Sequence, residues 1–255
     1  MKLSVSNLAW LPDADQSKVN EILDKYDVKF VEIAKRKKNY SEILESGKSV
    51  ASMQSIISEK EFSLFSSELD RSLIEIKLFK AISDAQNLNC NHIVYGCPAT
   101  RSVPDFDRSS KFDAAMSEII EMFREVADHS NDVVIGLEPV SERYGSQFVN
   151  NFREAVKVVK RVNRDNFKVN LDLANVLETG VRFEEIKRDI KYVSHVHVSE
   201  IDLKEIKYHE IVKDVLSFIE SDDELREKIT VSIEAVDLSL EELGRSLSTI
   251  KKYLD

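Results

Sequence analysis

Apolar residues follow two alternating patterns along the chain: short runs rich in Val, Ile and Leu, and longer stretches in which they stand three or four positions apart. Short runs of this kind are typical of strands buried on both faces of a parallel sheet, and the wider spacing is typical of helices. The predicted strands cover residues 3–5, 28–34, 48–53, 92–95, 132–138, 167–173, 192–198 and 229–235.

The helical pattern fills most of the intervals between these strands. It covers residues 16–26, 69–83, 112–127, 152–162, 183–190 and 211–219, and a capping box of Ser239 and Glu242 opens a last helix. Eight strands alternating with helices over 255 residues predict a (β/α)8 TIM barrel in a single domain, 1–255. The absence of a glycine-rich phosphate loop after the first strand argues against a nucleotide-binding open sheet.

One strand brings a carboxylate to the end of an otherwise apolar run. The stretch 132–139 reads DVVIGLEP, so that Glu138 stands immediately before Pro139. Proline cannot donate to a strand ladder and holds the preceding residue in extended geometry. We therefore expect Glu138 at the carboxyl end of the fifth strand, which is where barrels of this class carry their chemistry.

The last four strands each end in a polar residue after an apolar run: Glu138, Asp172, His197 and Glu234, separated by 34, 25 and 37 residues. Each interval corresponds to about one strand and helix, so the four side chains are expected at one rim of the barrel. Three carboxylates and an imidazole suit a hard divalent cation, with Mn²⁺ as the first choice and Mg²⁺, Co²⁺ or Zn²⁺ as alternatives. Each residue alone fits a helix cap or a water contact equally well. His195 points to the same side as His197 and is expected to be an interior or supporting residue.

Charge and cysteine content narrow the class of protein. The net charge of −10 argues against a nucleic-acid partner, which would require basic surface. Cys90 and Cys97 form no metal or disulfide pattern, which favours a reducing compartment. No signal-peptide pattern and no apolar run of the ~18 residues that a membrane span needs is present, so the expected location is cytoplasmic.

Several motifs together resemble a known family. With the four strand ends, the motifs SNLAW (6–10), VEIA (31–34), SMQS (52–55) and YGCP (95–98) look like the xylose-isomerase-like TIM barrels, in particular the sugar phosphate isomerase/epimerase group. The metal site is similar to that of the ketose 3-epimerases. Individually the motifs are weak, whereas their order and spacing over essentially the whole chain are more specific.

The resemblance implies roles for individual residues. Glu138, Asp172, His197 and Glu234 match the family's metal ligands, and Glu138 and Glu234 match the pair of glutamates that exchange a proton with a substrate carbon. The implied reaction is a sugar isomerisation or epimerisation through a metal-stabilised enediolate, which is consistent with the chemistry of carboxylate bases beside a divalent cation.

Four further residues are predicted substrate contacts. The resemblance places Glu32 and Gln54 in the pocket lining, although either is equally a hydrogen-bonding residue at the barrel rim. Asn175 stands where many relatives carry a histidine; it can bond a sugar oxygen but cannot exchange protons near neutral pH. Arg101 follows the fourth strand and could grip an oxyanion. The basic run at 35–38 is favoured as a solvated loop over an anion-attracting one.

Three alternatives stay open to an isomerase or epimerase that acts on a small carbohydrate substrate. A dehydratase or lyase could use the same site and expel a hydroxyl group. A metal-dependent DNA-repair endonuclease shares the fold, but the acidic charge and the small number of histidines oppose it. An inactive barrel that acts as a binding protein is consistent with Asn175 and with the lack of the arginine that ketose 3-epimerases carry after the strand-seven histidine. The identity of the sugar, its phosphorylation and a homo-oligomeric state are likewise open.

Overall fold

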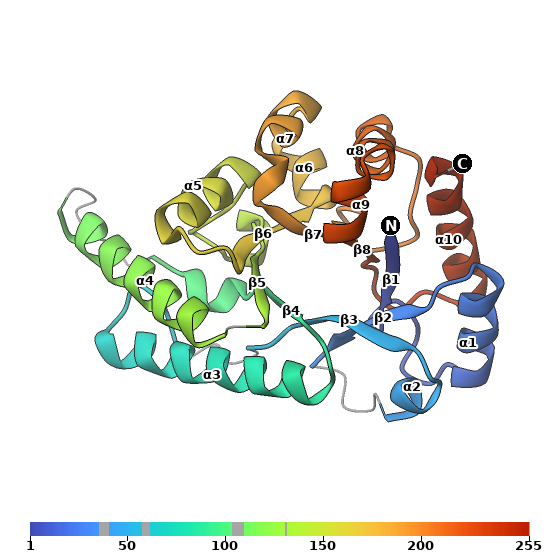
Figure 1. Cartoon of the computed structure of the whole chain (residues 1–255), viewed down its shortest axis with the longest axis horizontal. Helices are drawn as coiled ribbons and strands as arrows, with labels where there is room; N and C mark the ends of the chain where they lie inside the picture. Colours follow the sequence, from blue (N-terminus) through green and yellow to red (C-terminus); the bar gives the residue numbers. More distant parts are fainter. Residues whose placement is uncertain (36–40, 58–61, 104–109, 131, 255) are drawn as a thin grey trace.

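Eight parallel strands close into a barrel in the computed structural model, which describes residues 1–35, 41–57, 62–103, 110–130 and 132–254 (Figure 1). The strands are β1 Lys2–Ser6, β2 Phe30–Ala34, β3 Ser49–Gln54, β4 His92–Tyr95, β5 Val134–Leu137, β6 Phe167–Asp172, β7 Val193–Val198 and β8 Thr230–Ile233. Each strand pairs with its neighbour in sequence, and β1 pairs with β8 to close the ring. The predicted TIM barrel is confirmed.

Helices follow the strands around the outside of the barrel. They are α1 Gln16–Lys25, α2 Ser41–Glu45, α3 Glu68–Asn87, α4 Ser110–His129, α5 Phe152–Val162, α6 Leu173–Thr179, α7 Phe183–Asp189, α8 Glu210–Ser221, α9 Asp223–Lys228 and α10 Leu240–Leu254. Short 3-10 helices occupy η1 Pro98–Arg101, η2 Glu142–Tyr144 and η3 Ile190–Tyr192. In Figure 1 the last helix, α10, lies beside the first, α1, and the two are in contact.

Helix starts are fixed by side chains that satisfy the free N–H groups of the first turn. The side chains of Asp15, Ser67 and Asn151 accept from backbone N–H groups of α1, α3 and α5. At α10, Ser239 and Glu242 form the predicted capping box, in which each side chain accepts from the other residue's backbone N–H. The short helices α2, α6 and α9 were not predicted, because their few residues provide no helical period to recognise.

The interior of the barrel is polar. Glu32, Ser52, Asn170, His195 and His197 are each 0% exposed. Glu32 on β2 and His197 on β7 share a hydrogen bond although their strands are not neighbours in the sheet, so the contact must cross the interior. The alternate residues of each strand, such as Val31 and Ile33, belong to the apolar core between barrel and helices. Polar residues thus alternate with apolar ones in strands that were predicted from their apolar residues alone.

Two observations concern the cysteines and the possibility of a membrane span. Cys90 and Cys97 are both free and buried. Within the described ranges, no helix combines the length and apolar character that crossing a membrane requires.

Gly136 on β5 provides a test of how tightly this interior is packed. A Cβ atom at Gly136 would lie 2.8 Å from Cε1 of His92 and 3.3 Å from Cβ of Asn170. We expect Gly136→Ala to lower the free energy of unfolding by about 1–3 kcal/mol, as overpacking of a core does. Urea denaturation of the purified variant measures this change.

Gly244→Ala is the matched control. A Cβ there meets nothing within 4 Å, and the residue lies inside α10, so alanine should raise stability by up to about 1 kcal/mol. Equal effects of the two substitutions would contradict a tightly packed interior at Gly136.

Candidate active site

Glu138 lies at the carboxyl end of β5, as predicted. Its backbone N–H donates to the carbonyl of Tyr95 at 3.2 Å, which continues the ladder one residue beyond the strand. Its own carbonyl accepts a 2.7 Å hydrogen bond from Nη1 of Arg101, and Nη2 of Arg101 donates to the Tyr95 carbonyl at 2.6 Å. The main chain that carries this carboxylate is therefore held from both sides.

Gly96 leaves the space that the Glu138 side chain fills. A Cβ atom built on Gly96 would stand 1.8 Å from Oε2 of Glu138. That separation is far below any contact distance, so a larger residue at position 96 would displace the carboxylate. The position of the Glu138 carboxylate thus explains, on steric grounds, why the YGCP motif has a glycine at residue 96.

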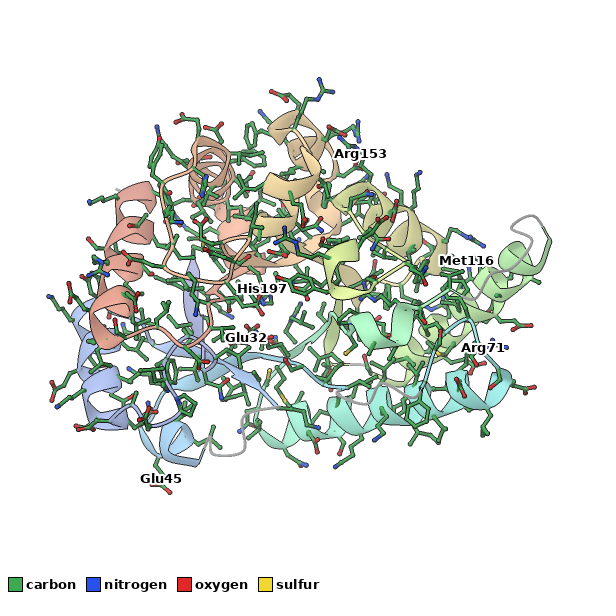
Figure 2. The ribbon with its side chains drawn as sticks, turned by 180° about the vertical axis from the view of Figure 1, so that it is seen from behind. Glu32, Glu45, Arg71, Met116, Arg153 and His197 are labelled. Atoms are coloured by element: carbon green, nitrogen blue, oxygen red, sulfur yellow. The ribbon has the colours of Figure 1, made fainter. Side chains whose placement is uncertain are left out.

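His197 is fully buried and contacts three carboxylates. Its Nδ1 lies 2.8 Å from Oε1 of Glu138 and 3.3 Å from Oε2 of Glu234, and its Nε2 lies 3.1 Å from Oε2 of Glu32. Figure 2 shows Glu32 and His197 close together near the centre of the barrel. The structure therefore brings together three of the four predicted ligands, Glu138, His197 and Glu234, with one ligand atom of each within 4.8 Å of the others.

The charges in this cluster shift one another's pKa values. Burial alone would lower the pKa of His197, but the carboxylates of Glu32, Glu234 and Glu138 outweigh it and raise that pKa well above its usual value. Burial would raise the pKa of Glu32, yet His197 and His195 hold it well below its usual value. The pKa of Glu138 is raised, chiefly by burial, despite the neighbouring imidazole.

Asp172, the fourth predicted ligand, reaches the same cavity but lies beside this three-atom cluster. Its Oδ1 accepts from the backbone N–H of Ala174 at 3.0 Å, which caps α6, and from the hydroxyl of Ser199. Burial and the carboxylates of Glu138 and Glu234 raise the pKa of Asp172 to about 7. The two sequence interpretations, helix cap and member of an acidic site, therefore both describe this residue.

A cavity of about 400 Å³ opens above the cluster. Its lining includes Glu138, Asp172, Glu234, Gln54 and Asn175. Of the predicted substrate contacts, Gln54 and Asn175 thus face the cavity. Asn175 donates to the carbonyl of Asn150 at 2.9 Å, while its buried Oδ1 has no hydrogen-bond partner within the described structure.

Glu32 and Arg101 are placed differently from the sequence expectation, since neither is part of the cavity lining. Glu32 lies beneath the cavity inside the barrel. The guanidinium of Arg101 is fully buried, lies 5.1 Å from the ring centroid of Tyr95 and binds backbone carbonyls. An arginine engaged in this way shapes the loop after β4 and is not presented to a substrate oxyanion.

The predicted basic run at 35–38 is described only at its first residue. Lys35 is paired with Asp84 on α3 at 2.5 Å. Residues 36–38 lie outside the described part of the chain.

Two residues of the site were not predicted from the sequence. Asn170 on β6 places Nδ2 2.8 Å from Oε1 of Glu138 and 3.2 Å from Nδ1 of His197. Glu200, after β7, lines the cavity and accepts from Nε2 of His209 and from the backbone N–H of Lys207. The alternation of a strand contained a signal for Asn170, because it stands two residues before Asp172 and so faces the same side.

A second group of possible ligand atoms, Glu32, His195 and His197, lies deeper in the barrel. Here Nε2 of His195 is 3.3 Å from Oε2 of Glu32. The Glu32 oxygens already accept from Ser52 at 2.6 Å and from Gln54 at 2.7 Å. This inner group therefore forms the support beneath His197, which agrees with the expectation that His195 is an interior residue.

The outer group has the donor set that a divalent cation requires. Oε1 of Glu138 and Oε2 of Glu234 both face Nδ1 of His197, at 2.8 and 3.3 Å, so a positive charge must lie between the two carboxylates and the ring. In the metal-free site the proton on His197 supplies it, and a cation can take the place of that proton. Carboxylate oxygens with one imidazole are ligands of Mn²⁺ and related ions. The residues present thus fit a bound divalent metal.

Comparison with solved structures finds the same fold at low sequence identity. D-psicose 3-epimerase from Clostridium cellulolyticum H10 aligns with a TM-score of 0.75 and 18% identity over 100% of both chains. The family 2 AP endonuclease from Brucella melitensis aligns with a TM-score of 0.75 and 19% identity, again over 100% of both chains. The 3-keto-D-glucoside 4-epimerase from E. coli aligns with a TM-score of 0.71 and 13% identity, over 99% of this chain and 98% of that one.

These likenesses establish the fold, and the family follows from sequence. No curated protein matches the chain. The family model described as xylose isomerase-like TIM barrel matches residues 61–215, which is more than half of the chain. Together with the closed barrel and the polar cluster at its carboxyl rim, this match shows that the chain belongs to the xylose isomerase-like TIM barrel family.

Proposed function

We propose that the protein is a divalent-metal-dependent isomerase or epimerase that moves a carbon-bound proton of a sugar. The observation that carries the proposal is the convergence of Glu138 and Glu234, which line the cavity, on the buried His197. The sugar epimerases among the structural neighbours support a sugar as the substrate class. The net charge of −10 disfavours the polyanionic substrate of an endonuclease.

Glu138, His197 and Glu234 would hold the metal, with Asp172 as the fourth ligand from the adjoining wall. Mn²⁺ is the first choice for this oxygen-rich set, and Mg²⁺, Co²⁺ or Zn²⁺ are alternatives. When bound, a divalent ion supplies Lewis-acid stabilisation of the negative charge that develops on substrate oxygen during proton removal. The cavity of about 400 Å³ beside the ligands leaves room for a small sugar.

Glu138 and Glu234 would transfer the proton. The two carboxylates reach the cavity from the ends of β5 and β8, with β6 and β7 between them around the barrel. Burial raises the pKa of Glu138, which favours the form that holds a proton and can deliver it. Gln54 and Asn175 would bond the sugar hydroxyls, since both have amide groups in the cavity wall.

Proton exchange tests the proposed reaction directly. Chelator-treated protein is reloaded with Mn²⁺ and incubated in D₂O with a panel of ketoses and their phosphates, and deuterium incorporation at carbon is followed by NMR. Glu138→Gln and Glu234→Gln should each slow incorporation by about 10²-fold or more, because glutamine cannot carry the proton.

Glu185→Gln is the control for this experiment. Glu185 is a buried carboxylate on α7 that is bound by Arg153 and does not line the cavity, so exchange should persist in the variant. Turnover retained by Glu138→Gln would remove Glu138 from the mechanism. Absence of exchange with every sugar by the Mn²⁺-loaded protein would overturn the proposed function, and a dehydrated product would indicate a lyase.

Metal removal should also change stability. A ligand that binds only the folded state at 100 times its Kd stabilises that state by about 2.7 kcal/mol, which for a chain of this size raises Tm by about 5–10 °C. We expect Mn²⁺ to restore this difference to chelator-treated protein and not to Glu234→Gln. Thermal unfolding followed by circular dichroism measures it, and identical melting with and without Mn²⁺ would argue for a barrel without a metal site.

The acidic cluster predicts a pH effect in the metal-free protein. Because the pKa of Asp172 is raised to about 7, the folded state keeps a proton that the unfolded chain releases near pH 4. Stability from this group is therefore complete below pH 4 and falls by about 1.4 kcal/mol per pH unit until pH 7.

Asp172→Asn isolates this contribution, since asparagine does not titrate. With chelator present, the free energy of unfolding of the wild type minus that of the variant should decrease between pH 5 and 7 and level off above pH 7. Urea titrations at each pH measure the difference. A difference independent of pH would show that Asp172 is already ionised in the folded state.

A further inference from the structure

We propose that Glu32 is a positioning residue that orients His197 and selects Nδ1 as its metal-ligating nitrogen. The proposal rests on the metal site of the proposed function and assigns to Glu32 a role other than substrate binding. It is carried by the geometry beneath the cavity, where Glu32 is fully buried and contacts the far side of the imidazole.

The Glu32 carboxylate is fixed before it meets His197. Its Oε2 accepts from the hydroxyl of Ser52 at 2.6 Å, and its Oε1 accepts from Nε2 of Gln54 at 2.7 Å. The Gln54 amide also donates to the hydroxyl of Ser6 at 3.1 Å, so that residues of β1 and β3 together fix the carboxylate on β2. A carboxylate bound in this way offers its remaining acceptor capacity in one direction, toward the barrel axis.

That direction determines which nitrogen of His197 carries a proton. An ionised carboxylate can only accept, so at 3.1 Å from Oε2 of Glu32 the Nε2 atom is the donor. By the same rule Nδ1 donates to Oε1 of Glu138 at 2.8 Å when no metal is bound. A cation between Glu138 and Glu234 takes the place of that proton, so the ring keeps its other proton on Nε2 and turns the lone pair of Nδ1 to the cation. Carboxylates that accept from the second nitrogen of a ligating histidine fix its tautomer and ring orientation in this manner.

Asn170 holds the Glu138 carboxylate on the other side of the ring. Its Nδ2 lies within donor distance of Nδ1 of His197 at 3.2 Å and of Oε1 of Glu138 at 2.8 Å. The hydrogen bond to Glu138 is the shorter of the two and satisfies the amide whether or not Nδ1 carries a proton. The orientation of this amide is assigned from its hydrogen bonds, and the one with Nδ2 toward Glu138 avoids two facing oxygens.

Loss of the Glu32 acceptor would leave the ring free to carry its proton on Nδ1. In that tautomer Nδ1 donates to Glu138, and the lone pair that a metal requires is turned away from the site. Glu32 therefore controls metal affinity without touching the metal or the substrate. Replacement of such partners of a ligating histidine typically weakens metal binding about 10–100-fold.

Metal binding, measured apart from turnover, tests the proposal. Mn²⁺ is titrated into chelator-treated wild type and Glu32→Gln, with free Mn²⁺ followed by EPR and the nitrogen coupling of bound Mn²⁺ by electron spin echo envelope modulation. We expect a Kd about 10–100-fold weaker in Glu32→Gln. The substitution preserves shape, and rotation of the Gln54 amide can restore its hydrogen bond to the new side chain.

Two further variants separate orientation from folding. Glu185→Gln makes the same chemical change at a buried carboxylate away from the cavity and should leave the Mn²⁺ Kd unchanged. Glu32→Asp keeps the charge but withdraws the acceptor by one methylene, so it should also weaken Mn²⁺ binding. It gives the answer if Glu32→Gln does not fold, and thermal unfolding in chelator reports the fold of each variant.

The outcomes distinguish this inference from the proposed function. Wild type that binds Mn²⁺ with nitrogen coupling, together with an unchanged Kd in a folded Glu32 variant, overturns the role of Glu32 and leaves the metal site intact. Wild type that binds no Mn²⁺, or binds it without nitrogen coupling, overturns the metal site and this inference with it.

Discussion

The hydrogen bond between Glu32 and His197 crosses the barrel from β2 to β7, and the arrangement of the site depends on it. A buried charged pair adds little net stability, because the cost of desolvation offsets the attraction. Its contribution here is one of orientation. With one nitrogen of the ring engaged below, the other is presented to Glu138 and Glu234 at the base of the cavity.

The polar interior that contains this pair also constrains the strands around it. Gly96 leaves the space in which the Glu138 carboxylate lies, and Arg101 binds the backbone carbonyl of Glu138. Gly136 likewise leaves space for the ring of His92, deeper in the barrel. Small residues thus stand beside large polar ones on neighbouring strands, which is how a barrel interior accommodates charged groups without losing its packing.

Periodicity in the sequence was sufficient for the barrel and for the strand ends. The helix at Phe152–Val162 and the strand at His92–Tyr95 were predicted with the bounds that the structure has, because a strong period or a short apolar run leaves little choice. Contacts across the barrel interior could not be predicted from the sequence, since they join strands that are far apart along the chain. Arg101 shows the limit: a guanidinium suits an oxyanion and a backbone carbonyl equally, and only the fold decides between them.

Asp172 shows why a strand end can serve structure and chemistry together. The sequence left open whether Asp172 caps a helix or faces a ligand. The two roles can use different oxygens of the same carboxylate. Both of its hydrogen bonds, from the backbone of Ala174 and from Ser199, go to Oδ1. Oδ2 is then the oxygen that can turn to a ligand in the cavity. The cap fixes the carboxylate in place, and a fixed carboxylate close to Glu138 and Glu234 is one whose charge a bound cation would stabilise.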